Sequence, residues 1–418
     1  MLAGDFLPPE TQTWLAVVLQ LLLLSGAIGL VVTLLSDRAI RRTLKGHRRV
    51  FRALPPLPVE PGTPLPAISI LKPVKGVDEG LAENLLSLMA QDYPDFEILV
   101  GAASSSDPAL ALVRRLSADH PAVRLRIIVC PEDGGLNPKV SILRTLSGFA
   151  CSDLILISDS NVRVGPGYIA ATARELRDPG VGLVTNPIAG TGEESLGARF
   201  EGLHLATYVA RALSFASAYL GRSCVVGKSM MFRLSDLRRL GGWSEVRDVL
   251  AEDYALGHAF ERAGFRVAVS PFVVFNFNQS WPVSRFVNRH LRWGQMRRRT
   301  SLLAYLLEPL FNPNALFTVA VLLAFGSGGG TARALLPWAS AGVSMRLLAD
   351  WRLLRRMRPC APRLSFVLLG VPKDLLVLGL WLAAGFRRTV DWRGRRFIIG
   401  AGTRLEPIAT PVSRMQPG

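Results

Sequence analysis

Hydrophobic positions divide the chain into a long apolar run near its beginning and an alternating body. Residues 15–35 are apolar except for Gln20, Ser25, Thr33 and small residues. A helix of this length would cross a bilayer core of roughly 30 Å. Beyond residue 66, short apolar runs alternate with amphipathic segments. The pattern therefore predicts a transmembrane helix within residues 1–36, ahead of a folded α/β body.

The alternating body predicts a sheet covered by helices. Strands are expected at 67–72, 96–101, 123–129 and 154–158, and helices at 81–91, 108–118 and 140–149. Strands separated by helices of this length favour a largely parallel sheet with both faces covered. Ligands of such sheets bind at the carboxyl ends of the strands. Asp159 directly follows the fourth strand and is expected at that edge.

After residue 300 the chain becomes apolar again, with predicted membrane segments at 309–326 and 334–349. A third apolar segment, 364–386, is interrupted by Pro-Lys-Asp at 372–374 and has Arg-rich flanks on both sides. A spanning helix would leave one basic flank outside, so a re-entrant hairpin is expected, with a span carrying a neutralised Lys–Asp pair as the alternative. The predicted parts are an N-terminal transmembrane helix (1–36), a basic, Pro-rich cytoplasmic linker (37–66), an α/β domain (67–300), C-terminal membrane helices (301–386) and a basic cytoplasmic tail (387–418).

The distribution of charge separates membrane contact from nucleic-acid binding. The 418 residues include 49 Lys and Arg against 32 Asp and Glu, a formal charge of +17. Four blocks hold 24 of the basic residues and only two acids: 38–52, 285–299, 346–363 and 387–396. Basic blocks beside apolar runs are typical of cytoplasmic segments that face anionic lipid, and no nucleic-acid-binding motif is present. The chain is therefore expected to be a multi-pass membrane protein with a cytoplasmic body, and its Arg-, Ala- and Leu-rich composition favours a bacterial inner membrane.

The positions of the cysteines and histidines argue against two further classes of protein, disulfide-stabilised scaffolds and proteins with a histidine-rich metal site. The four cysteines are scattered without a pairing pattern, which argues against a disulfide scaffold. The five histidines lack the spacing of metal ligands. The candidate chemistry therefore rests on carboxylates, amides and basic side chains.

The segment ISDSNVRV (157–164) is the first candidate site. Asp159 and Asn161 are two positions apart, so in an extended segment their side chains point the same way. Their oxygens could hold one divalent cation, Mg²⁺ or Mn²⁺, and such a cation could neutralise a diphosphate leaving group. The alternative is an ordinary turn, because Asp, Ser and Asn favour turns.

Two further segments, both predicted to be helical, carry candidate chemistry. Glu252 and Asp253 begin an amphipathic helix. A carboxylate at this position could act as a general base directed at a substrate, or it could only stabilise the helix by interacting with the positive end of its dipole. Arg289, Arg292 and Trp293 form an RxxRW motif, and its two arginines share a helix face. They could grip a diphosphate and a sugar ring, or belong to an interfacial basic helix.

The NPKV segment (137–140) is the last candidate. Lys139 could meet a phosphate while Asn137 fixes the loop. The alternative is a solvated loop before a helix.

In this order, the segments resemble the ceramide glucosyltransferase family, family 21 of the membrane-bound glycosyltransferases, which is related to family 2. The hopanoid-associated glycosyltransferases of bacteria are also similar. The resemblance extends from about residue 67 to residue 400. The matching segments are LKPVKG (71–76), NPKV (137–140), ISDSNVRV (157–164), VGLVTN (181–186), VVGKSMMFR (225–233), AEDY (251–254), RHLRW (289–293) and WRGRRF (392–397).

The chain departs from the family pattern at two places. Asn161 stands where the family's Asp-x-Asp motif has its second Asp, and the acidic cluster after the second strand is reduced to ASSSDP, in which only Asp107 is acidic. The resemblance implies that Asp107 recognises the uridine, with Ser104 or Ser106 sharing the role.

The resemblance implies a GT-A fold for residues 67–300 and an inverting transfer from a UDP-sugar, expected to be UDP-glucose, to the primary hydroxyl of a ceramide-like lipid. Asp253 would accept the proton of that hydroxyl. Asp159 and a divalent cation would hold the diphosphate.

Arg289, Arg292 and Trp293 would close over the donor and stabilise the leaving group. The lipid would enter from the cytoplasmic leaflet. The alternatives are a hopanoid glycosyltransferase, a processive polysaccharide synthase, which would need more membrane helices, and a non-catalytic membrane adaptor that kept the fold.

Overall fold

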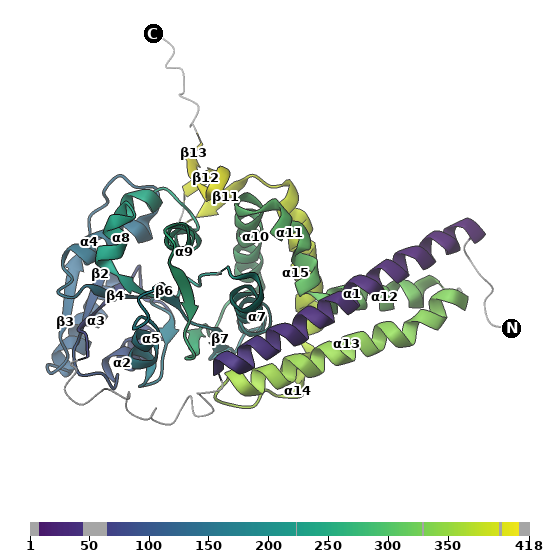
Figure 1. Cartoon of the computed structure of the whole chain (residues 1–418), viewed down its shortest axis with the longest axis horizontal. Coiled ribbons are helices and arrows are strands. Elements are labelled where there is room, and N and C mark those ends of the chain that lie inside the picture. The colour runs from purple at the N-terminus through teal and green to yellow at the C-terminus, as the bar shows by residue number, and fades with distance from the viewer. Residues whose placement is uncertain (1–7, 45–64, 223, 328–329, 393–394, 409–418) are drawn as a thin grey trace, which may run out of the picture.

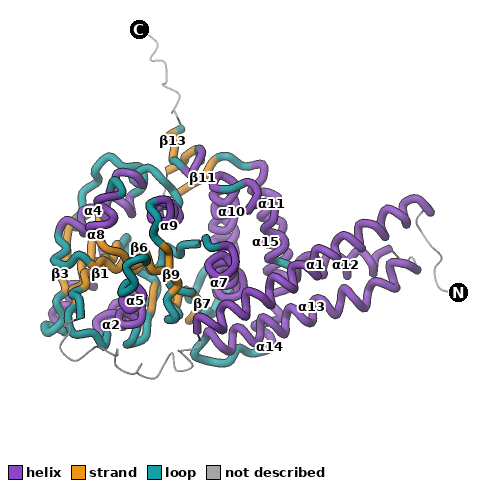
Figure 2. The backbone as a smooth tube through the Cα atoms, in the orientation of Figure 1, coloured by secondary structure: helices purple, strands orange, loops and turns teal. Residues whose placement is uncertain are grey.

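The computed structural model describes residues 8–44, 65–222, 224–327, 330–392 and 395–408. Figure 1 shows an α/β body from which long helices project on one side. The tube in Figure 2 shows strands gathered inside the body and helices around them. The predicted combination of an α/β body and membrane-type helices is thus confirmed. Most of the predicted linker, residues 45–64, lies outside the described residues.

The central sheet has seven strands in the order β3-β2-β1-β4-β8-β6-β9. Strands β3, β2, β1 and β4 are parallel, whereas β8 runs antiparallel to both β4 and β6. Every residue of β1 and β4 is buried, as expected for strands covered on both faces. The strands are β1 (Ile68–Pro73), β2 (Phe96–Ala102), β3 (Leu125–Val129), β4 (Leu154–Ser158), β6 (Val181–Thr185), β8 (Ser229–Arg233) and β9 (Arg266–Val269).

Helices cover both faces of this sheet. One face packs on α2 (Leu81–Met89), α3 (Pro108–Asp119) and α5 (Tyr168–Glu175) through a core that includes Leu85, Leu110 and Ile169. The other packs on α4 (Pro138–Gly148), α8 (Leu234–Arg239) and α9 (Glu252–Arg262) through Leu143, Leu237 and Phe260. The predicted strands and helices up to residue 158 are confirmed, with ends shifted by a few residues at most.

Local sequence determines where two of these helices begin. Asp107 caps α3 by accepting from the main-chain N of Ala109, and Asn137 caps α4 by accepting from Lys139 and Val140. In both helices a proline occupies the first position, where a missing N–H costs nothing. These caps place the two loops that precede α3 and α4 beside the carboxyl edge of the sheet.

A second layer joins the body to the projecting helices. A small sheet of β5 (Val162–Arg163), β10 (Val274–Phe277) and β7 (Ile188–Thr191) leads into α6 (Leu196–His204). The helix continues through a π-helical turn, η2 (Leu205–Val209), into α7 (Ala210–Phe215) and a second π-helical turn, η3 (Ala216–Leu220). The long basic helix α10 (Val283–Thr300) packs against α6 and against α15 (Gly370–Phe386).

Among the described residues, two helices are long and apolar enough to cross a membrane, α1 (Pro9–Thr43) and the segment Leu364–Phe386. A third span is possible where Leu302–Phe311 meets α12 (Pro313–Ser327) at a bend of 63°. The predicted segment 334–349 lies inside α13 (Gly330–Met357), which packs along α1 and α12. α13 carries buried Arg346 and Asp350, so it does not share the apolar character of the others.

For residues 364–386, the choice between the expected re-entrant hairpin and the alternative spanning helix stays a prediction, but residues 372–374 are helical and form no hairpin turn. α14 (Leu364–Leu368) and α15 run on as one helical segment of 23 residues. Pro372 is tolerated because it lies in the first turn of α15, where no hydrogen bond depends on its nitrogen. Lys373 and Asp374 are buried and form an ion pair at 2.5 Å, and Asn314 of α12 donates to Asp374 at 3.1 Å. The interruption is therefore an internal polar contact of the helix bundle and forms no turn.

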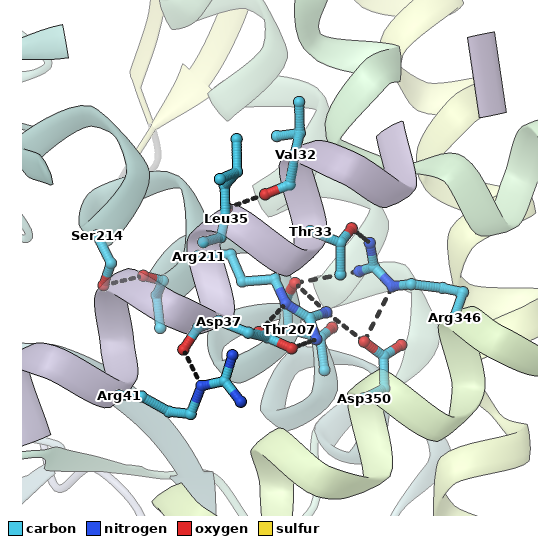
Figure 3. A network of polar contacts seen from close by, with 12 residues as sticks. Val32, Thr33, Leu35, Asp37, Arg41, Thr207, Arg211, Ser214, Arg346 and Asp350 are labelled. Carbon is cyan, nitrogen blue, oxygen red and sulfur yellow. Dashed lines mark hydrogen bonds and ion pairs between the residues drawn. The ribbon is translucent and has the colours of Figure 1, made fainter. Parts of the chain in front are cut away.

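A buried polar network fastens α1 and α13 to the body (Figure 3). Arg211 of α7 binds Asp37 of α1 at 2.9 Å and also binds Asp350 of α13. Arg346, which is 1% exposed, donates to Asp350 at 2.9 Å and to Thr33 at 2.9 Å. Each buried charge is thus matched, which is the condition under which buried ions are tolerated. The network fixes the orientation of the projecting helices on the body.

The predicted basic tail contains a folded element. β11 (Thr389–Trp392), β12 (Arg395–Ile399) and β13 (Leu405–Pro407) form an antiparallel sheet. Val390, Phe397 and Leu405 of this sheet pack with Leu250, just before α9. Strands β11, β12 and β13 therefore support the segment that carries Glu252 and Asp253.

Candidate active site

A cavity of about 830 Å³ opens at the carboxyl ends of β1 and β4. Its walls come from the segments after these two strands, the start of α4, residues 224–228 before β8, the start of α9, and α10. Most of the predicted site residues line the cavity, whereas Asp107, Asn137, Ser104 and Ser106 do not. Those that line it are Lys139, Asp159, Asn161, Glu252, Asp253, Arg289, Arg292 and Trp293.

Lys139 joins three of these walls. Its Nζ lies 2.9 Å from Oδ1 of Asp159 and 2.9 Å from Oε1 of Glu252, and it donates to the carbonyl of Gly227 at 3.1 Å. Asn137 strengthens the same junction by donating to the carbonyl of Val249 at 2.7 Å. Burial opposes the charge on Lys139, but Asp159 and Glu252 outweigh it and raise the pKa of the ammonium. Lys139 therefore remains positively charged.

Asp159 is held by two ammonium groups. Besides Lys139, Lys228 lies 3.1 Å from its second carboxylate oxygen, Oδ2. Burial alone would raise the pKa of Asp159, but Lys139 and Lys228 lower it, so the carboxylate stays ionised. Lys228 also donates to Oδ1 of Asn161 at 2.6 Å, and the amide nitrogen of Asn161 donates to Asn278 at 3.2 Å.

These contacts do not fit a divalent cation at Asp159 and Asn161. Both carboxylate oxygens and the amide oxygen already accept from lysine ammonium groups, so a cation there would lie against like charges. Within the described part of the chain, no three His, Cys, Asp or Glu side chains form a group that could hold a metal ion. The predicted Mg²⁺ or Mn²⁺ stays a prediction, and no step below depends on it.

Asp253 presents a carboxylate to the cavity from the first turn of α9. Its Oδ2 accepts from the main-chain N of Gly227 at 2.8 Å, and its Oδ1 accepts from the N of Tyr254 at 2.8 Å. Burial, together with the neighbouring charge of Glu252, raises the pKa of Asp253 to about 6. A carboxylate with such a pKa is ionised near neutral pH yet basic enough to accept a proton.

The RxxRW motif is oriented by a buried acid that its spacing did not reveal. Glu201 of α6 is fully buried, and its carboxylate lies 3.3 Å from Nε of Arg289 and 2.7 Å from Nε2 of His290. Burial would raise the pKa of Glu201, but Arg289 and His290 lower it to about 2. The resulting anion fixes the face that α10 turns to the cavity.

Aromatic rings flank the arginines of α10. The guanidinium of Arg289 lies 4.7 Å from the ring centre of Trp293 and 5.3 Å from that of Trp281. Arg285 lies 4.2 Å from the ring centre of Trp281. Stacked guanidinium and indole groups offer both charge and flat surfaces, which suit an anionic ligand that carries rings.

Asp107 lies away from the cavity wall. Its carboxylate caps α3 and accepts from the main-chain N of Gly76 at 3.0 Å. Ser104 and Ser106 bond to each other through their hydroxyls at 2.7 Å. Asp107 thus holds the loop after β1, whose residues Lys75 and Asp78 line the cavity. Its predicted contact with uridine is not tested by this placement.

One side of the cavity is apolar and belongs to the helices that join the membrane part. Leu205, Tyr208 and Val209 of η2 and Ala212 of α7 line it. α7 packs against α1, which is long and apolar enough to span a bilayer. The cavity therefore combines charged side chains from the sheet edge, α9 and α10 with apolar side chains from η2 and α7.

Several of these residues escaped the sequence reasoning. Lys228 lies in a matching segment, VVGKSMMFR, but nothing in its local pattern assigned it a role. Glu201 and Trp281 lie outside the recognised segments, and only their position in space reveals them. One sequence signal could have indicated Glu201: it is an acidic residue within a mostly small and apolar stretch, where a carboxylate is expected to be buried and paired.

Comparison with known proteins assigns the family. A model described as "Glycosyl transferase family 21" matches residues 23–405. The chain belongs to glycosyltransferase family 21. The resemblance stated from the sequence is confirmed, and with it the predicted enzyme class, a hexosyltransferase.

Individual relatives of this family 21 chain are distant. It is 28% identical to "Ceramide glucosyltransferase 1" of Caenorhabditis elegans over 351 residues, which cover 83% of this chain and 74% of the relative. It is 25% identical to an "N-acetylglucosaminyltransferase" of Rhizobium leguminosarum bv. viciae, over 75% of this chain and 77% of the relative. A solved structure of the mannosyltransferase PcManGT from Pyrobaculum calidifontis, in complex with GDP-Man and Mn²⁺, aligns with 86% of this chain and 99% of its own at 21% identity and a TM-score of 0.49.

Proposed function

We propose that this family 21 enzyme transfers a sugar, glucose in the first instance, from a UDP-sugar to the primary hydroxyl of a ceramide-like lipid, with inversion at the anomeric carbon. The observation that carries the proposal is the position of Asp253. Its carboxylate faces a cavity that has charged side chains from the sheet edge, α9 and α10 and apolar side chains from η2 and α7. A nucleotide-sugar suits the charged side chains, and the hydroxyl end of a lipid suits the apolar ones.

In the proposed reaction, Asp253 accepts the proton of the acceptor hydroxyl as its oxygen attacks the anomeric carbon. The two main-chain N–H groups on Asp253 fix the direction of its carboxylate. Arg289 and Arg292 lie over the departing diphosphate, and Trp293 covers the sugar. The positive charges of α10 stabilise the leaving group as negative charge develops on it.

The membrane helices explain how such an acceptor could reach the cavity. A ceramide-like lipid stays in the bilayer, so its hydroxyl must be met at the membrane surface. The apolar side chains of the cavity lie on the helices that pack against α1. We place the protein as a multi-pass enzyme of the bacterial inner membrane, with the body in the cytoplasm, which is supported by the basic blocks beside its apolar segments.

The test uses the full chain, purified in detergent and offered radiolabelled UDP-glucose with ceramide or with a hopanoid. Asp253→Asn, which removes the base and keeps the shape, is the control. Label in ceramide with the wild type alone supports the proposal. Label only in the hopanoid keeps the mechanism and overturns the acceptor.

The donor is varied in a second series with UDP-N-acetylglucosamine, UDP-galactose and UDP-glucuronate. Transfer from one of these and not from UDP-glucose replaces the sugar in the proposal. Equal transfer by Asp253→Asn overturns the role of Asp253.

A further inference from the structure

Three lysine side chains surround Asp159 at the carboxyl end of β4. Lys139 and Lys228 each contact one carboxylate oxygen, at 2.9 and 3.1 Å. Lys72, which is fully buried, donates to the main-chain carbonyl of Asp159 at 2.8 Å. Only Lys139 has a second carboxylate partner among its described contacts, Glu252. Burial lowers the pKa of Lys72 to about 7, so the positive charge at the place of the predicted metal ion comes mainly from Lys139 and Lys228.

The ammonium groups occupy the very oxygens that a metal would need. To bind Asp159 and Asn161, a divalent cation would have to displace Lys139 from Oδ1, and Lys228 from both Oδ2 and the amide oxygen. Two ammonium groups and a divalent cation around one carboxylate would repel each other strongly in a site of low exposure. The chain itself therefore supplies cations at this place.

We propose that Lys228, with Lys139 beside it, takes the place of a divalent cation and neutralises the diphosphate of the nucleotide-sugar donor. An ammonium group has three N–H donors, and the described partners of Lys228 are two side chains, Asp159 and Asn161. Its third N–H is directed to a diphosphate oxygen in the cavity that Lys228 lines. The inference rests on the proposed function, because the diphosphate is that of the proposed donor.

The charge balance of the reaction calls for such a group. In the transfer, a bond forms between the acceptor oxygen and the anomeric carbon, and the bond from that carbon to the diphosphate oxygen breaks. The diphosphate keeps the electron pair and gains one negative charge, while the acceptor proton passes to Asp253. Fixed positive charges beside the departing oxygen lower the energy of this step, as a metal would otherwise do.

The cavity as a whole carries the charge for an anionic ligand without a metal. Seven basic side chains line it against four acidic ones, and two of the basic ones, Arg289 and Arg297, are also paired with the buried acids Glu201 and Glu308, so a small excess of positive charge remains. The basic set is Lys75, Lys139, Lys228, Arg285, Arg289, Arg292 and Arg297, and the acidic set is Asp78, Asp159, Glu252 and Asp253. A ligand with a diphosphate would offset this excess.

Binding of UDP to the full-length protein tests the inference separately from catalysis. Calorimetric titration in detergent with EDTA is expected to give UDP binding that added Mn²⁺ strengthens less than twofold. Lys228→Gln should weaken UDP binding about tenfold to a hundredfold, the range expected for a lost charge-assisted hydrogen bond, and leave uridine binding unchanged. Lys228→Arg keeps the charge and should retain most of the affinity.

Arg115→Gln is the matched control, since it removes the same charge from an exposed position on α3 that does not line the cavity. Its effect on UDP binding should be within about threefold, as expected for a solvent-exposed charge. An equal loss in Arg115→Gln and Lys228→Gln overturns the inference, because it would then reflect total charge alone. Binding of UDP that requires Mn²⁺ or Mg²⁺, with stoichiometric uptake of Mn²⁺ by electron paramagnetic resonance, overturns it as well.

The proposed function and this inference fail in different ways. Metal-free binding of UDP that depends on Lys228, without transfer to any lipid, supports the inference and overturns the acceptor. Absence of UDP binding, with and without a metal, overturns both.

Discussion

The main-chain N of Gly227 donates to Oδ2 of Asp253 at 2.8 Å, so a residue before β8 aims the carboxylate at the start of α9. The side chain of Asp253 packs directly against the main chain of Gly227. A Cβ atom on Gly227 would lie 2.5 Å from that oxygen and 2.9 Å from Cβ of Asp253. Any side chain at position 227 must therefore displace the carboxylate.

Gly227→Ala is expected to lower kcat about a hundredfold, because a displacement of about 1 Å at a reacting group costs that much. UDP binding should stay within a few fold of the wild type, since the lysines remain. The measurement is a comparison of kcat with the dissociation constant of UDP. Gly148→Ala is the control, because a Cβ there meets nothing within 4 Å. Normal turnover in Gly227→Ala would contradict the role of Asp253.

The pH profile should report the ionisation of Asp253. Its pKa is raised to about 6, so lowering the pH through this value protonates the base, and raising it restores the ionised form. We expect kcat/KM to rise with a slope of one up to about pH 6 and to level off above it. Glu252→Gln removes the neighbouring negative charge, so the rising limb should move to lower pH. A limb that moves to higher pH in this variant would count against the assignment.

Arg289→Lys keeps the positive charge at this position of the RxxRW motif but removes the planar guanidinium group. A lysine has no planar fork to reach Glu201 while it lies over Trp293 and Trp281. We expect kcat/KM to fall about tenfold, equivalent to about 1.4 kcal/mol of transition-state stabilisation. Arg299→Lys, on the same helix, is the control and should behave as the wild type. Full activity of Arg289→Lys would mean that charge alone suffices at this position.

The network around Asp350 should dominate the stability of the joint between body and projecting helices. Asp350→Asn leaves the buried guanidinium groups of Arg346 and Arg211 without their shared carboxylate. Removing one partner of a buried ion pair costs about 3–5 kcal/mol, so the thermal unfolding temperature in detergent should fall clearly. Asp391→Asn breaks only the exposed pair with Arg396 and should leave that temperature unchanged. Equal unfolding temperatures for the two variants would refute this account.

The sequence by itself determined the elements of the sheet. The strands at Ile68–Pro73 and Leu154–Ser158 and the helix at Pro138–Gly148 follow from local periodicity and from caps such as Asn137. It also indicated the family and several of the charged and polar residues that line the cavity, because their motifs are short and contiguous. The local sequence pattern is enough to locate these elements, because the residues that are buried on one face of a strand or helix recur at regular spacing along the chain.

Only the tertiary structure decided which charges meet. Lys139, Asp159, Lys228 and Glu252 come from four separate segments, and no periodicity links a lysine before one strand to an aspartate after another. The same holds for Asp374, which pairs with Lys373 and accepts from Asn314 of a neighbouring helix, a contact that the apolar pattern of 364–386 does not indicate. The sheet formed by residues 389–407 was hidden by its basic side chains, because its strands are stabilised by packing on Leu250, far away in the sequence. Pairing of distant groups depends on where folding brings them together, and this is information that a linear pattern lacks.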